Sequence, residues 1–96
     1  MCQPLVGHAG DGNFHLIIPF YPNNQAQVSA AEELSHYLVQ QALALQGTCT
    51  GEHGIGLRKK AYLLQEHGAH AVNLMGVIKR ALDPKNIMNP GKILDL

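Results

Sequence analysis

The sequence predicts an α+β fold, in which an antiparallel sheet fragment carries about three helices on one face. A hairpin signal at residues 7–15 comes first and is followed by the apolar run Phe14–Phe20. Three stretches with helical spacing or composition follow, and a turn-rich tail ends the chain. Because strand signals precede the helices instead of alternating with them, the pattern favours α+β over a parallel α/β arrangement.

The hairpin signal is Gly-His-Ala-Gly-Asp-Gly-Asn-Phe-His at residues 7–15. Asp11-Gly12 is a pair that a two-residue type I′ turn favours, because both central residues need a positive φ. Such a turn would place His8 directly opposite His15, with Cβ atoms about 5 Å apart on one face. Two imidazoles at that separation are able to share one divalent metal. The alternative interpretation is a tight turn flanked by two solvated histidines.

A strand and a long helix are expected next. The run Phe14–Phe20 is apolar on both faces, which predicts a central strand covered on both sides. Ser29 and Glu32 form a capping-box pair, which predicts a helix from Ser29 to about Gln46. Gly47 is then placed to cap its C-terminus in the left-handed conformation.

Two further helices are expected over residues 57–67 and 69–82, separated at Gly68. Asp83-Pro84 should stop the second, because the residue before proline disfavours the α region. Its apolar stripe is formed by Val72, Met75, Ile78 and Leu82. The tail carries an Asn-Pro-Gly turn signal at residues 89–91.

Composition limits the function. The chain has 96 residues and 15% charged side chains, below the average of about 25%, which fits a fragment whose surface is covered by more protein. Seven basic and seven acidic residues leave no net charge, which argues against nucleic acid as a partner. The basic cluster Arg58-Lys59-Lys60 is interpreted as a solvated first helical turn.

Two further features of the sequence bear on the cellular location of the protein. No apolar run reaches the roughly 18 residues of a membrane span, so no transmembrane segment is expected. Cys2 and Cys49 do not form a disulfide framework, which favours a reducing compartment. We therefore expect a cytoplasmic location, with redox partners as the route of any membrane association.

Four residues in two glycine-rich motifs carry the candidate chemistry. His8, His15 and Glu52 offer two imidazoles and a carboxylate, the donors of a catalytic site for zinc, with Mn²⁺ or Fe²⁺ as alternatives. Adjacent side chains on an extended backbone point to opposite sides, so one of Glu52 and His53 should bind the metal while the other faces substrate. A metal there would activate either water, as in a hydrolase, or an α-hydroxy acid. The residues alone leave both reactions open.

Three motifs, at residues 7–15, 47–56 and 82–92, resemble the C-terminal segment of FAD-linked D-2-hydroxyacid dehydrogenases. This group of vanillyl-alcohol-oxidase-type flavoenzymes covers cytochrome-linked D-lactate dehydrogenases and FAD-binding glycolate oxidase subunits. The resemblance implies that residues 1–96 form the C-terminal part of a ferredoxin-like cap domain that holds substrate. It also implies that the tail returns to an FAD domain absent from this chain.

The resemblance implies a role for each candidate residue. His8, His15 and Glu52 correspond to metal ligands, for zinc or manganese. His53 corresponds to the base that removes the substrate's hydroxyl proton while hydride leaves for the flavin.

The resemblance also assigns three supporting positions. Asn13 would support the hairpin loop, and Asn89 would lie where the tail approaches the flavin ring. Members that act on dicarboxylates resemble one another in having asparagine two residues after the second histidine, where this chain has Ile17. A small monocarboxylate, lactate or glycolate, is therefore favoured.

Three functions follow as expectations. The first is a C-terminal fragment of an FAD-dependent dehydrogenase that oxidises a small D-2-hydroxy acid to the 2-oxo acid. Because hydride acceptance belongs to the flavin, the isolated fragment should be inactive. The second is an independent metal-dependent hydrolase. The third is a non-catalytic module that self-associates as a homodimer through an exposed edge of Phe14–Phe20.

Overall fold

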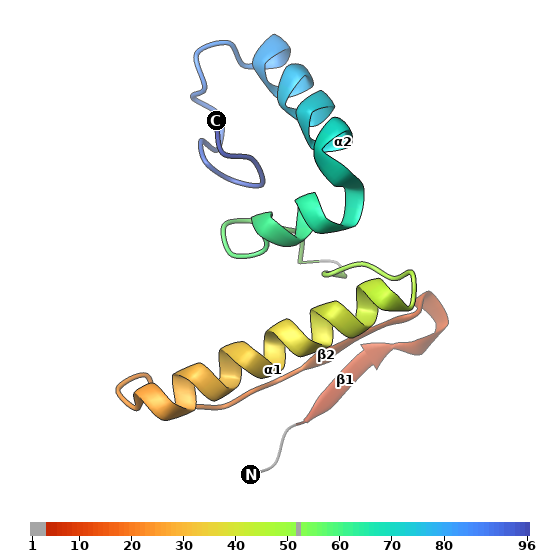
Figure 1. Ribbon diagram of the computed structural model, residues 1–96, viewed down its shortest axis with the longest axis vertical. Coiled ribbons are helices and arrows are strands. Elements are labelled where there is room, and N and C mark those ends of the chain that lie inside the picture. The colour runs from red at the N-terminus through yellow and green to blue at the C-terminus, as the bar shows by residue number, and fades with distance from the viewer. Residues whose placement is uncertain (1–3, 52) are drawn as a thin grey trace. The chain divides into compact units, whose positions relative to one another are not determined.

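The computed structural model describes residues 4–51 and 53–96. Two compact units divide the chain, Met1–Leu45 and Gln46–Leu96. The elements are two strands, a 3-10 turn and two helices, in the order β1 (Leu5–His8), η1 (Ala9–Asp11), β2 (Asn13–Leu16), α1 (Gln25–Ala44) and α2 (Lys60–Leu82) (Figure 1). An antiparallel sheet followed by helices confirms the predicted α+β class.

The hairpin turn differs from the predicted one. Four residues, 9–12, connect β1 to β2, and His8 pairs with Asn13. The Gly12 amide donates to the Ala9 carbonyl at 3.2 Å, and Gly12 takes the left-handed conformation at φ 75° while Asp11 stays in η1. The prediction of a two-residue type I′ turn was therefore wrong. A four-residue loop needs a left-handed conformation at the glycine alone, whereas type I′ also demands it of the aspartate.

Strand β2 is shorter than the sequence pattern indicates. It ends at Leu16, and the amide of Ile17 adds one more bond to the carbonyl of Pro4 at 3.1 Å. The expectation of a central strand reaching Phe20 was wrong, because in the part of the chain that the structure describes β2 pairs with β1 alone. β1 has four residues, so the backbone after Ile17 has no strand to pair with there.

Helix α1 begins before the predicted capping box. Asn24 is its N-cap, and the Asn24 side-chain oxygen accepts from the Gln27 amide at 3.2 Å. Ser29 therefore lies inside the helix, and the predicted start was wrong. Asparagine caps as well as serine, and starting at the earlier cap adds helical hydrogen bonds. At the other end Gln46, not Gly47, has the positive φ, at 63°.

The two predicted C-terminal helices are the two arms of α2. Gly68 interrupts it with φ 82° and ψ 167°, a conformation that is essentially restricted to glycine. Figure 1 shows the bend between the arms. α2 ends at Leu82, directly before Asp83-Pro84, as predicted. The apolar stripe is only partly covered, because Ile78 is 51% exposed and Leu82 is 80% exposed.

Asp83 anchors the tail that follows α2. Its side chain is buried, and its two oxygens accept the amides of Ile87 at 3.1 Å and Met88 at 2.9 Å. The Lys79 ammonium pairs with Asp83 and also donates to the Met88 carbonyl at 2.6 Å. The Lys79 hydrogen bond, followed by the Met88 amide, lowers the pKa of Asp83 from 3.8 to about 2. The tail is therefore held by a carboxylate that must stay ionised.

Little apolar surface is buried. Among the described residues, the buried apolar side chains are Val39, Cys49 and Leu63. Many large apolar side chains are exposed, including Leu5, Phe14, Tyr21, Leu45, Leu82 and Ile87. Such a surface is typical of a piece that packs against further protein. No helix in the described ranges is long and apolar enough to cross a membrane.

Gly7→Ala should destabilise the hairpin. A Cβ at Gly7 would lie 2.4 Å from the Asn13 carbonyl oxygen and 2.8 Å from the Phe14 Cα. Since these are backbone atoms, the strands must separate, and we expect the free energy of unfolding to fall by about 1–3 kcal/mol in urea denaturation. Gly10→Ala is the matched control, because a Cβ there meets nothing within 4 Å. Equal effects of the two substitutions would contradict the register.

Acid should release the tail through Asp83. Because the folded pKa of about 2 lies below the ordinary 3.8, the ionised carboxylate stabilises the fold above that ordinary value. This stabilisation is lost as pH falls through about 2. We expect amide protection at Ile87 and Met88 to drop in that window, measured by hydrogen exchange. Asp83→Asn should flatten the profile and Asp11→Asn should not; an unchanged profile in Asp83→Asn would refute the assignment.

Candidate metal and proton-transfer site

The hairpin presents His8 and His15 on one face. His15 pairs with Val6, so the predicted direct opposition of the two histidines was wrong. The true register differs from the predicted one by two residues, and side chains alternate with a period of two, so neither histidine changes face. The two become diagonal neighbours, about 7–8 Å apart at the backbone, a separation that long side chains bridge.

Asn13 ties the loop to the strand that carries His8. The Asn13 side-chain oxygen accepts the His8 backbone amide at 3.3 Å. Asn13 also occupies the position directly opposite His8 in the register. This contact restrains the backbone from which the His8 imidazole projects. The role of Asn13 in supporting a functional loop stays a prediction.

Ile17 continues the face of the two histidines. Its amide bonds to the Pro4 carbonyl, so the ladder register extends to this residue. Two residues beyond His15, its side chain returns to the same side of the ribbon. Ile17 is 54% exposed, which leaves an apolar side chain beside the histidine face.

The second glycine-rich motif forms a loop braced from two directions. The Lys59 ammonium donates to the Cys49 carbonyl at 2.9 Å, and the Ile93 amide donates to the Gly56 carbonyl at 2.7 Å. Gly54 and Gly56 have φ of 77° and 59°, which residues with a Cβ rarely adopt. His53 lies in this loop and is exposed. Glycines on its C-terminal side keep side-chain bulk away from the imidazole.

Three of the four predicted site residues are described, and they fall into two groups. His8 and His15 lie together in the first unit, and His53 lies in the second. Glu52 lies outside the described residues. Among the described residues, which do not include Glu52, no cluster of three or more His, Cys, Asp or Glu side chains is arranged to hold a metal. The ligand set His8, His15 and Glu52 therefore stays a prediction.

Two of the predicted ligands have donor groups suited to a metal ion. Two imidazoles on one hairpin face are suitable donors for a divalent ion such as zinc or manganese. Asn89, predicted to lie near the flavin, is exposed and has φ 47° in a turn closed by the Lys92 amide and the Asn89 carbonyl at 3.2 Å. That turn holds the Asn89 side chain at the surface, and its contact with a flavin stays a prediction.

The sequence analysis did not predict the structural roles of three residues. The basic cluster at residues 58–60 was interpreted as solvated, yet Lys59 braces the glycine loop and Lys60 pairs with Asp95 at 2.6 Å. Asp83 was interpreted only as a helix stop. The partners of Lys59 and Lys60 lie 10 and 35 residues away along the chain, so no local pattern contains them.

Comparison with known proteins identifies the family. Residues 4–93 match the family of FAD linked oxidases, C-terminal domain. The chain belongs to this family. The resemblance to FAD-linked D-2-hydroxyacid dehydrogenases is thereby confirmed.

Three relatives illustrate the range of named activities. A probable mitochondrial D-lactate dehydrogenase of Danio rerio is 50% identical over 93 residues, which are 97% of this chain and 19% of that protein. A mitochondrial D-2-hydroxyglutarate dehydrogenase of Danio rerio is 43% identical over 88 residues, 92% of this chain and 16% of that protein. The glycolate oxidase subunit GlcD of Bacillus subtilis is 39% identical over 87 residues, 91% of this chain and 18% of that protein. The chain thus spans less than a fifth of the length of these relatives.

Lys59→Met should expose the glycine loop. The variant removes a charge-assisted hydrogen bond to the Cys49 carbonyl, so local opening around the buried Cys49 should increase roughly tenfold or more. The measurement is the rate of thiol labelling at Cys49 in a Cys2→Ser background. Lys85→Met, at an exposed tail lysine, is the control and should leave the rate unchanged. Unchanged labelling in Lys59→Met would show that the brace does not hold the loop.

Proposed function

We propose that this chain supplies the metal-binding and proton-transfer part of the active site of an FAD-linked dehydrogenase. Its reaction is the oxidation of a small D-2-hydroxy acid, lactate or glycolate, to the 2-oxo acid. The observation that carries the proposal is the family match over residues 4–93, which contains both histidine motifs. The placement of His8 and His15 on one hairpin face supports it.

The residues divide the work between binding and proton transfer. His8, His15 and Glu52 would hold a divalent ion, zinc or manganese, beside the substrate. Such an ion, when bound, polarises the hydroxyl and lowers its pKa. His53 takes the hydroxyl proton on an imidazole nitrogen and must be neutral to do so.

The remaining electrons leave as hydride. A bound FAD would supply the hydride acceptor, so that His53 has only the hydroxyl proton to remove and both hydrogens of the substrate are accounted for. The flavin is held mainly by a domain outside this chain, with Asn89 at the approach of the tail. The relatives are more than five times longer than the segment they share with this chain, which leaves length for such a domain.

The substrate class rests on Ile17. An apolar side chain on the histidine face offers no hydrogen bond to a second carboxylate, which favours a monocarboxylate. The 50% identity to a D-lactate dehydrogenase supports lactate. A dicarboxylate is the competing class, because a D-2-hydroxyglutarate dehydrogenase is 43% identical. The zebrafish D-lactate relative is named as mitochondrial, so a cytoplasmic location stays a prediction.

Self-association is a second candidate function, with one observation in its favour. β1 and β2 form a two-stranded sheet within the described ranges, and Phe14 and Ile17 in the run Phe14–Phe20 are 57% and 54% exposed. Such an edge is able to pair with a strand of a second copy. Sedimentation of the chain distinguishes the two cases, because a clean monomer at high concentration removes the homodimer.

A chimaera tests the main proposal. This chain replaces the matching segment of the Danio rerio D-lactate dehydrogenase, to which it is 50% identical over 93 residues. We expect dye reduction with D-lactate and glycolate. His53→Ala should lower kcat by about 10²–10⁴-fold while FAD content and bound metal are unchanged. His8→Ala and His15→Ala should lower bound metal, measured by elemental analysis, together with activity.

His70→Ala is the matched control, because His70 is exposed on α2 and has no role in the proposal. It should keep metal and activity. Full activity in His53→Ala, or full metal content in His8→Ala and His15→Ala, would overturn the assigned roles. Faster turnover of D-malate than of D-lactate would overturn the substrate class alone. Metal-dependent ester hydrolysis by the chain without a flavin domain would favour the hydrolase.

A further inference from the structure

The second unit contains a cavity that the proposed function does not use. It has a volume of about 620 Å³, within the roughly 300–1,000 Å³ of small-molecule pockets. Its walls come from the start of α2, from the second arm of α2 and from the tail. The apolar residues that line it are Leu57, Ala61, Leu64, Val72, Ile93, Leu94 and Leu96.

The charged side chains in the same lining are mostly cationic. They are Arg58, Lys60 and Arg80, against one carboxylate side chain, Asp95. Lys60 is already neutralised, because its ammonium lies 2.6 Å from the Asp95 carboxylate. Arg58 and Arg80 have no ion-pair partner in the part of the chain that the structure describes. The lining therefore carries two guanidinium groups outside the Lys60–Asp95 ion pair.

The Lys60–Asp95 ion pair also links two walls of the cavity. The pair joins the start of α2 to the tail, and the Ile93 amide adds a second link to the Gly56 carbonyl. The main-chain oxygen of Leu96, which also lines the cavity, accepts from Asn86 Nδ2 at 2.8 Å. The apolar wall formed by the tail is thus fixed in place.

Arg80 is folded back along α2. A Cβ at Gly76, four residues earlier, would lie 3.4 Å from Arg80 Nη1 and 3.6 Å from Nη2. Gly76 is buried in the helix interior, where glycine costs about 1 kcal/mol relative to alanine. The absence of a side chain at Gly76 leaves room for the guanidinium against the helix. A planar group with five N–H donors is thereby placed in the lining of an apolar cavity.

We infer that this cavity binds an amphipathic oxyanion, an aliphatic chain that ends in a carboxylate or a phosphate monoester. The chain lies on the apolar wall, and Arg80 receives the head group through paired N–H···O bonds, with Arg58 adding positive charge. An aliphatic body is favoured over an aromatic ring, because the described residues that line the cavity include no Phe, Tyr or Trp. The inference is independent of His8, His15 and His53.

The experiment is an amide-shift titration of the full 96-residue chain by NMR. The probes are decanoate, decyl phosphate, the neutral decanol and inorganic phosphate, all below micelle-forming concentrations. Decanoate or decyl phosphate should shift the amides of Ala61, Gly76 and Leu94 with saturation, and the stronger of the two identifies the head group. Decanol and inorganic phosphate should bind at least about tenfold more weakly.

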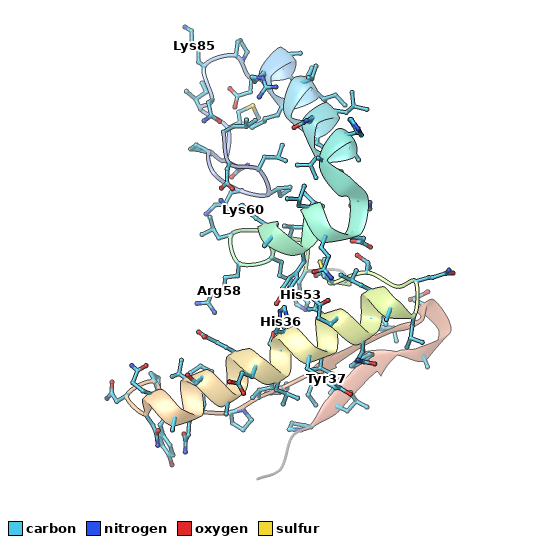
Figure 2. All side chains as sticks on the ribbon, in the orientation of Figure 1. His36, Tyr37, His53, Arg58, Lys60 and Lys85 are labelled. Atoms are coloured by element: carbon cyan, nitrogen blue, oxygen red, sulfur yellow. The ribbon has the colours of Figure 1, made fainter. Side chains whose placement is uncertain are left out.

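Arg80→Gln should weaken the binding of the amphiphile about tenfold or more, since it removes the charged guanidinium that donates two hydrogen bonds to the head group. Lys85→Gln is the matched control; Figure 2 shows Lys85 and Lys60 toward opposite ends of the second unit, and Lys85 does not line the cavity. Ala61→Phe should block binding, because the larger side chain would occupy part of the cavity. Because Arg80 is exposed, Arg80→Gln leaves the fold intact and decides the question even if Ala61→Phe unfolds.

Several results would overturn the inference. Equal binding of decanol and decanoate would show an apolar surface without anion recognition. Equal binding of inorganic phosphate would show simple attraction to cations. Unchanged affinity in Arg80→Gln, shifts confined to residues outside the cavity, or no binding of either amphiphile would each remove the site.

Discussion

The antiparallel pairing of β1 with β2 decides which side chains of the first unit share a face. Gly7 allows it, because the backbone of the opposite strand occupies the space that a Cβ would need. Leu5 lies opposite Leu16, and every second side chain along each strand points to the same side of the ribbon. His8 and His15 come to the same side for this reason, and Ile17 follows them. The proposed metal ligands and the proposed substrate-specificity residue thus depend on a single register.

In the second unit the corresponding constraint is the attachment of the tail. Asp83 holds the backbone that follows α2, and Lys60 holds Asp95 near the tail's last residues. The tail in turn supports the glycine loop that carries His53, through the bond from the Ile93 amide to the Gly56 carbonyl. The same return of the tail forms one wall of the cationic apolar cavity. The support of the glycine loop and the formation of the cavity therefore both depend on the attachment of the tail.

The exposed apolar surface fits a chain that spans less than a fifth of its relatives' length. The second arm of α2 carries apolar side chains around much of its circumference, and Leu74 and Leu82 are among the exposed ones. A helix that is apolar on several sides is normally buried on several sides. The described residues cover one of those sides with the tail, which agrees with the proposal that a flavin domain packs against this segment.

Local chemistry in the sequence was sufficient for the α+β class, for the hairpin at residues 7–15, for the end of α2 before Pro84 and for the break at Gly68, because each depends on residues within a few positions. The family resemblance was also readable, since its motifs are contiguous. Only the tertiary structure decided the register of the hairpin, the start of α1 at Gln25 and the partners of Lys59 and Lys60. The reason is physical: competing turns and caps differ little in local energy, and the groups that select among them lie far apart along the chain.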